Sequence, residues 1–135
     1  MMILTHIAML GWIPVAMGLF LLMKPRRAVM AGYILAMLFL PNYQYEIPKL
    51  MDYTKFTAAS IGLLMAAMMF DWRTITNFRP HWVDIPMLIW CVVPFMSSMA
   101  NDTGIHDYYG FYDGMSSSLY QTFAWGIPYF LGRVY

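Results

Sequence analysis

Long apolar stretches alternate with short polar connections along this chain. The apolar stretches cover residues 2–23, 28–40, 56–70, 85–100 and 115–131. An α-helix rises about 1.5 Å per residue, so roughly 20 apolar residues cross the hydrocarbon core of a bilayer. The pattern predicts an all-α fold: a polytopic transmembrane helical bundle of about five spans, forming a single domain over residues 1–135.

The first stretch, residues 2–23, contains no charged residue. A cleaved signal peptide carries positive charge before its apolar region and small residues after it. Here the positive charges, on Lys24, Arg26 and Arg27, follow the apolar region instead. The segment is therefore interpreted as a retained span, in which Pro14 introduces a kink rather than a break.

The last stretch, residues 115–131, is more polar than the others. Its first half contains Ser116, Ser117, Ser118 and Gln121. It could cross the bilayer, re-enter it or lie along its surface. We favour a span.

Composition strengthens the membrane interpretation. Hydrophobic residues make up 61% of the chain and charged residues only 11%, whereas soluble domains carry about 25% charged residues. A net charge of +1 leaves no basic face for nucleic acid. The single cysteine, Cys91, can form neither an internal disulfide nor a cysteine-based zinc site alone.

The distribution of charge predicts an orientation. Six of the eight basic residues fall in alternate connections and at the C-terminus: Lys24, Arg26, Arg27, Arg73, Arg79 and Arg133. The opposite connections keep Lys49 and Lys55, together with Glu46, Asp52, Asp102, Asp107 and Asp113. Because cytoplasmic loops carry the excess of basic residues, the N-terminus is expected outside and the C-terminus inside.

Small residues recur at four-residue intervals in two neighbouring stretches. They are Ala28, Gly32 and Ala36 in one stretch, and Ala58, Gly62 and Ala66 in the other. This spacing puts small residues on one helix face and allows close backbone approach, so the two helices are expected to pack together. The alternative is that alanine and glycine are simply common in membrane helices.

The common catalytic signatures are absent from the sequence. It has no zinc-binding His-Glu-x-x-His, P-loop, dinucleotide-binding glycine pattern or nucleophile elbow. No catalytic residue, metal site or cofactor is therefore predicted. On the inner side, Asp71, Arg73, Arg79, His81 and Asp84 are expected to be solvated anchors.

Polar and aromatic residues gather instead on the predicted outer side. Eight of them form a candidate saccharide-binding set: Tyr43, Glu46, Lys55, Asp102, His106, Asp107, Tyr112 and Asp113. Carboxylates accept hydrogen bonds from sugar hydroxyls, aromatic rings cover apolar sugar faces, and a histidine exchanges a proton near neutral pH. The alternative, which the residues alone favour, is an interfacial aromatic belt with ordinary solvated acids.

Several short strings carry a family resemblance. They occupy residues 70–73, 78–87, 90–94, 97–102, 112–114 and 125–133, and include Phe-Arg-Pro-His-Trp-Val-Asp-Ile-Pro-Met and Trp-Gly-Ile-Pro-Tyr-Phe-Leu-Gly-Arg. Together they resemble the N-terminal part of bacterial O-antigen ligase and polymerase-like membrane proteins. The resemblance extends over most of residues 40–135.

The resemblance implies a polytopic protein of the bacterial inner membrane. Enzymes of this family transfer or polymerise glycans carried on polyprenyl diphosphate at the outer face of the membrane. Their candidate catalytic arginines and histidine lie in later helices and a large periplasmic loop, and no position here matches them. The expected partners are thus the lipid bilayer, a polyprenyl-diphosphate-linked saccharide and a downstream chain that supplies the remaining helices. The chain alone is expected to be inactive.

Two other functions remain open. One is a small, non-enzymatic membrane protein that serves as an accessory or assembly partner. The other is a small transporter, which needs a polar site near the bilayer midplane, and the sequence offers little for one.

Overall fold

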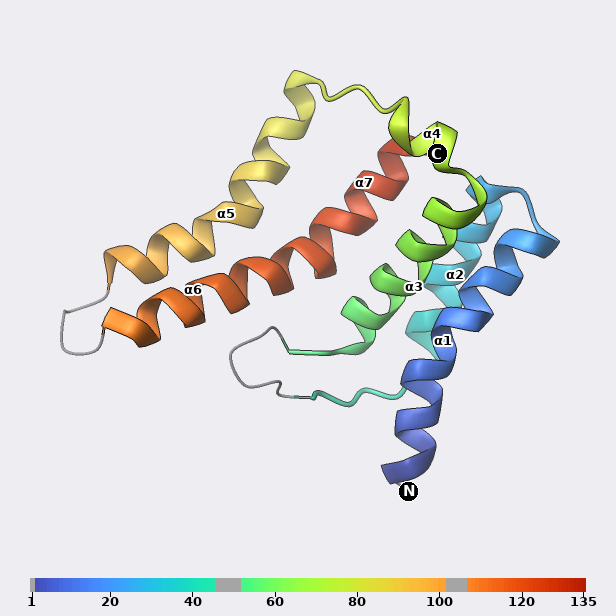
Figure 1. The fold of residues 1–135 in the computed structure, drawn as a ribbon, viewed down its shortest axis with the longest axis horizontal. Coiled ribbons are helices and arrows are strands. Elements are labelled where there is room, and N and C mark those ends of the chain that lie inside the picture. Colours follow the sequence, from blue (N-terminus) through green and yellow to red (C-terminus); the bar gives the residue numbers. More distant parts are fainter. Residues whose placement is uncertain (1, 46–51, 102–106) are drawn as a thin grey trace.

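Helices account for 84% of the residues that the structure describes. The computed structural model describes residues 2–45, 52–101 and 107–135, and this part of the chain contains no β-strand (Figure 1). The elements in chain order are α1 (Met2–Leu22), α2 (Pro25–Phe39), α3 (Lys55–Phe70), α4 (Trp72–Thr76), the 3-10 turn η1 (Trp82–Asp84), α5 (Ile85–Ala100), α6 (Asp107–Gln121), the π-helical turn η2 (Thr122–Gly126) and α7 (Ile127–Val134). The predicted all-α class is confirmed.

The helices form a three-helix bundle with a hairpin at its side. Helices α1, α2 and α3 pack against one another, while α5 and α6 form an antiparallel pair (Figure 1). The hairpin meets the bundle at one end of the molecule, which we call the closed end, where η2 and α7 pack against α3. At the opposite end, which we call the open end, the hairpin diverges from the bundle. The α1–α2 turn, α4 and the C-terminus lie at that closed end, and the N-terminus lies at the opposite end (Figure 1).

Within the described residues, two helical stretches are long and apolar enough to cross a membrane. They are Thr5–Leu22 and Trp82–Ala100, whereas Lys55–Phe70 is apolar but shorter. Each of the first four predicted apolar stretches coincides with one helix to within a few residues. The number of spans and their orientation stay predictions.

Residues 115–131 extend over three elements rather than one. The path runs from α6 through η2 into α7 without an extended segment. Pro128 has no N–H to donate to the preceding turn, so an ordinary α-helical hydrogen bond is lost there. The π-helical turn directly before α7 is the local adjustment that accompanies this loss.

Helix α3 lies at the centre of the bundle and is built from small residues. Its buried positions are Thr57, Ala58, Ala59, Ser60, Gly62, Leu63, Ala66 and Ala67. Small side chains let α1 and α2 approach the α3 backbone closely. The polar Ser60 hydroxyl lies 3.3 Å from the Tyr33 hydroxyl of α2, so a hydrogen bond satisfies both groups inside the bundle.

The predicted packing of α2 against α3 is confirmed, and alanines of the two small-residue sets share core clusters, Ala28 with Ala66 and Ala36 with Ala58. A Cβ atom on Gly32 of α2 would clash with Leu63 of α3. A Cβ atom on Gly62 of α3 would instead lie 2.9 Å from the Trp12 ring and 3.5 Å from Ala16, both on α1. The two glycines therefore have different neighbours, because α3 packs against α2 on one side and α1 on another: Gly32 makes room for Leu63 of α3, and Gly62 makes room for Trp12 of α1.

Helix α5 leaves a large apolar face uncovered. Its only fully buried residue is Cys91, while Leu88, Ile89, Trp90, Val92, Val93 and Met96 are all exposed. Continuous apolar surface of this kind marks contact with a membrane or with another protein. The face is consistent with a helix that lies in lipid.

Candidate functional site

Half of the predicted saccharide-binding set has no described side chain. Glu46, Asp102 and His106 lie outside the described residues. Asp107 begins α6, and only its place in that helix is described. Their part in a site stays a prediction.

Tyr43 and Lys55 lie near the start of α3. The Tyr43 ring is exposed and meets the ring of Tyr45 edge-on at 4.7 Å between centroids. Lys55 is the first residue of α3, and its ammonium group lies 5.7 Å from the centroid of the Phe56 ring. Both side chains are therefore placed where a polar ligand from outside the bundle could reach them.

Tyr112 and Asp113 lie on α6, near the tip of the hairpin. Asp113 is exposed, and the Tyr112 ring contacts the ring of Phe111 at 5.9 Å. The first turns of α6 lie away from the segment before α3 (Figure 1). The structure thus does not bring these two residues together with Tyr43 and Lys55, and a common saccharide site for all eight residues stays a prediction.

An aromatic cavity lies beside the first of these groups. Tyr45 and Tyr53 pair in an antiparallel bridge through two backbone hydrogen bonds of 3.1 and 2.9 Å. Together with His6, Met9 and Leu10 they line a cavity of about 320 Å³. The His6 and Tyr45 rings meet edge-on, with 4.8 Å between centroids. Burial raises the pKa of both Tyr45 and Tyr53 above the ordinary value, so both phenols stay neutral.

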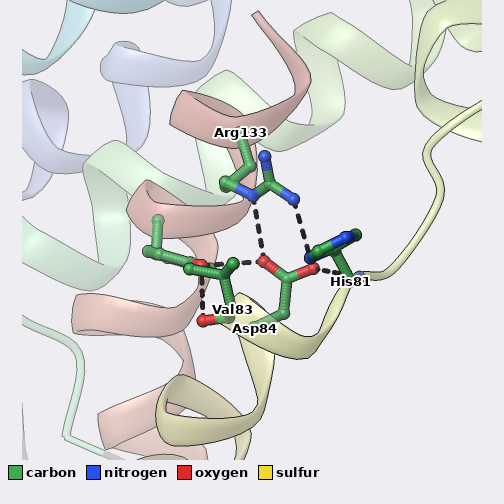
Figure 2. Close-up of polar contacts among 5 residues, drawn as sticks. His81, Val83, Asp84 and Arg133 are labelled. Carbon is green, nitrogen blue, oxygen red and sulfur yellow. Dashed lines mark hydrogen bonds and ion pairs between the residues drawn. The ribbon is translucent and has the colours of Figure 1, made fainter.

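The best-defined polar cluster lies at the opposite, closed end. We call Asp84, Tyr129 and Arg133 the polar clamp (Figure 2). The Arg133 Nε donates to Asp84 Oδ1 at 2.9 Å, and the Tyr129 hydroxyl donates to the same oxygen at 2.7 Å. The backbone N–H of His81 donates to Asp84 Oδ2 at 2.7 Å. The clamp joins η1, at the start of α5, to α7.

The carboxylate of the polar clamp is enclosed and fully paired. Asp84 is only 6% exposed as a residue, whereas the Arg133 side chain is 39% exposed. A buried carboxylate that accepts several hydrogen bonds, one from a guanidinium, is held in its ionised form. In turn, the hydrogen bond to Asp84 raises the pKa of Arg133 above its ordinary value.

The expectation that Asp84 is a solvated anchor is therefore wrong. The reason is the antiparallel path of α5 and α7, which brings the last turn of α7 over η1. Asp71 is half-buried and accepts a 2.6 Å hydrogen bond from the Thr74 hydroxyl. By contrast, Arg73, Arg79 and His81 are exposed as expected.

Tyr135 adds a neutral phenol at the same end of the molecule. Burial raises the pKa of Tyr135 to about 12, and the negative charge of Asp71 acts in the same direction. The ring meets Phe20 of α1 edge-on at 6.4 Å. The C-terminal residue is thereby packed onto the three-helix bundle.

Two serine hydroxyls fix the α5–α6 hairpin. Ser118 donates to the backbone carbonyl of Cys91 at 2.6 Å, and Ser98 donates to that of Gly110 at 2.7 Å. A polar side chain inside an apolar helix pair needs such a partner because no water competes there. Ser118 is one of the polar residues that lower the hydrophobicity of the last apolar stretch. In the structure it is a packing residue that holds α6 against α5.

The polar clamp is the feature that sequence reasoning missed. A signal for it exists: Asp84 stands directly before an apolar helix, and Arg133 stands at the end of another. Ionisable residues at such positions pair with one another when the helices are antiparallel. The partner could not be chosen from the sequence because Asp71 offers Arg133 an equivalent carboxylate.

The fold and the polar clamp define an all-helical protein with two helices that could cross a membrane. Within the described ranges, no group of three or more histidine, cysteine or acidic residues could hold a metal ion. Comparison with protein-family models, curated proteins and solved structures finds no match to the chain.

Proposed function

We propose that this chain is a membrane module of a glycan ligase or polymerase of the O-antigen type it resembles. It lies in the bacterial inner membrane with five spans, its N-terminus outside and its C-terminus inside. It contributes helices and outer segments that hold a polyprenyl-diphosphate-linked saccharide. Further helices, supplied by a downstream chain, carry the catalytic groups.

One observation carries the proposal. Two of the strings that support the resemblance, residues 78–87 and 125–133, meet in the polar clamp through Asp84, Tyr129 and Arg133. The resemblance therefore falls on residues that make specific polar contacts across 45 positions of sequence.

The open end of the molecule suits a saccharide better than it suits catalysis. It carries exposed aromatic and carboxylate side chains, and the aromatic cavity of about 320 Å³ lies between α1 and the Tyr45–Tyr53 bridge. Transfer from a diphosphate needs positive groups that stabilise the leaving phosphate. Lys55 is the only outer cation with a described position, so the chemistry requires cations from elsewhere.

Binding of a lipid-linked saccharide tests this function. The purified chain in lipid nanodiscs is titrated with a polyprenyl-diphosphate-linked saccharide and, separately, with the bare polyprenyl diphosphate, while tryptophan fluorescence is recorded. We expect tighter binding of the saccharide-bearing lipid. Tyr43→Ala should weaken it about fivefold, because an aromatic contact contributes about 1 kcal/mol.

Trp72→Ala is the matched control, since Trp72 is also an exposed aromatic residue but lies at the closed end. It should leave saccharide binding unchanged. Equal affinity for both lipids, or equal losses in the two variants, would contradict the proposed function.

A non-enzymatic assembly protein is the second candidate, and the uncovered apolar face of α5 favours it. Such a face can pack on the helices of another membrane protein as well as on lipid. This function predicts no preference for the saccharide-bearing lipid in the same titration. It also predicts that Trp90→Ala, on that face, disrupts association without changing lipid binding.

A further inference from the structure

A polar cavity opens at the closed end of the molecule, beside the polar clamp. Its volume is about 380 Å³, and its walls are Thr74, Asn77, Phe78, Arg79, Arg133 and Val134. These residues come from α4, from the connection that follows it and from the last turn of α7. Two arginines from distant parts of the chain thus line one small space.

The Arg133 side chain is held in place by Asp84 and Phe78. Its Nε is fixed by Asp84 at 2.9 Å, and its guanidinium carbon lies 5.9 Å from the centroid of the Phe78 ring. One terminal nitrogen of Arg133 points away from Asp84 (Figure 2). A guanidinium that is already ordered loses little conformational freedom when it binds an anion.

Arg79 supplies a second positive charge. It is exposed and makes no ion pair within the part of the chain that the structure describes. Of the nearby acids, Asp84 pairs with Nε and one terminal nitrogen of Arg133, at 2.9 and 3.5 Å, and Asp71 accepts the hydrogen bond from Thr74, so neither acid is paired with Arg79. The Asn77 side chain adds an amide donor to the same wall.

The surroundings of the cavity favour an anion at the surface of a membrane. Trp72 and Trp82 are both exposed at this end, 55% and 81% respectively, and tryptophans gather at the level of lipid headgroups. The α1–α2 turn, with Lys24, Arg26 and Arg27, lies at the same end (Figure 1). Basic pockets between helices on the cytoplasmic side are typical sites for acidic headgroups.

We propose that this cavity binds the phosphate group of an anionic phospholipid of the inner leaflet. The guanidinium groups of Arg79 and Arg133 pair with the phosphate oxygens, and Asn77 donates a further hydrogen bond. The proposal rests on the membrane placement given under the proposed function, with the closed end inside. It does not depend on the glycan chemistry assigned to the open end.

Lipid retention on the purified chain tests the site. The protein in detergent is mixed with phosphatidylglycerol, phosphatidylcholine or inorganic phosphate, and bound ligand is measured by native mass spectrometry. We expect retention of phosphatidylglycerol and little retention of phosphatidylcholine, because the choline ammonium offsets the phosphate charge and is repelled by the two arginines. Inorganic phosphate should also be retained little, because it lacks the acyl chains that anchor a lipid beside the protein. Arg79→Gln should weaken phosphatidylglycerol binding about tenfold, since it removes a charge-assisted hydrogen bond.

Arg26→Gln is the charge-matched control, because Arg26 is exposed at the same end but outside the cavity. It should leave retention unchanged, and neither variant should alter the thermal midpoint. Equal losses in both variants, or equal retention of phosphatidylcholine, would overturn the site as non-specific attraction. Inorganic phosphate that binds as well as the lipid would overturn the lipid assignment.

The headgroup site and the proposed glycan function can be contradicted separately. Trp72→Ala and Tyr43→Ala probe opposite ends of the molecule, and neither removes a wall of the phosphate cavity. Loss of saccharide binding with phosphatidylglycerol retained would contradict only the glycan function. Loss of phosphatidylglycerol selectivity with saccharide binding intact would contradict only the headgroup site.

Discussion

Asp84 is the residue on which the closed end of the molecule depends. Its carboxylate accepts hydrogen bonds from Arg133, Tyr129 and the His81 backbone, and it is nearly inaccessible. Removing one member of an enclosed ion pair leaves the other without its partner. The contacts of Asp84 therefore matter for holding α7 over the start of α5, whatever the protein binds.

Substitution of Asp84 should destabilise the protein more than substitution of an exposed acid. Asp84→Asn keeps the shape but removes the charge that pairs with Arg133, so the thermal midpoint in detergent is expected to fall. Tyr129→Phe removes one of the hydrogen bonds and should cause a smaller decrease. Thermal unfolding followed by circular dichroism measures both.

Asp113→Asn is the matched control because Asp113 is exposed on α6. It should leave the midpoint unchanged. A midpoint for Asp84→Asn that equals that of the control would show that the polar clamp does not stabilise the fold.

At the scale of helices, close packing depends on particular glycines. Gly114 of α6 lies against α5, where an added Cβ would be 2.9 Å from Ser98 Cβ and 3.3 Å from the Phe95 Cα. Because Phe95 Cα is backbone, it cannot move aside without shifting the helix. Gly18 of α1, by contrast, has nothing within 4 Å of such a Cβ.

Gly114→Ala should therefore loosen the hairpin, while Gly18→Ala should not disturb the bundle. Overpacking of this kind costs about 1–3 kcal/mol, whereas replacing an unconstrained helical glycine by alanine gains up to about 1 kcal/mol. Unfolding free energies measured in mixed micelles should move in opposite directions for the two variants. A gain for Gly114→Ala would contradict the close approach of α5 and α6.

The helices were largely predictable from the sequence, and their contacts were not. Apolar runs bounded by Lys24, Pro41 or Trp72 mark helix ends through local physics alone. The facing of Gly62 toward α1 could not be predicted, because a small residue at the right spacing fits any neighbouring helix. The same holds for Asp84, whose burial follows from a contact 49 residues away.

At the scale of the whole molecule, the two ends differ in chemistry. The closed end holds the polar clamp, the two-arginine cavity and most of the basic residues. The open end holds the aromatic cavity and the described outer residues Tyr43 and Lys55. The predicted orientation, with the basic connections inside, would put the closed end at the cytoplasmic side.

The candidate saccharide site could be predicted only in part, for a physical reason. Residue types show that carboxylates and aromatic rings belong to the outer connections, but not which connections meet. Divergence of the α5–α6 hairpin separates the start of α6 from Tyr43 and Lys55 (Figure 1). That divergence is set by where η2 and α7 contact α3, which depends on the whole bundle.

We propose that this chain crosses the inner membrane five times, with its basic connections inside. Mapping its topology with reporters tests this arrangement of the spans. Reporters that distinguish cytoplasm from periplasm are fused after Arg27, Lys49, Asn77 and Asp107 in separate full-length fusions. We expect inside, outside, inside and outside, in that order, because the excess of basic residues stays in the cytoplasm. A cytoplasmic signal at Asp107 would contradict the five-span account.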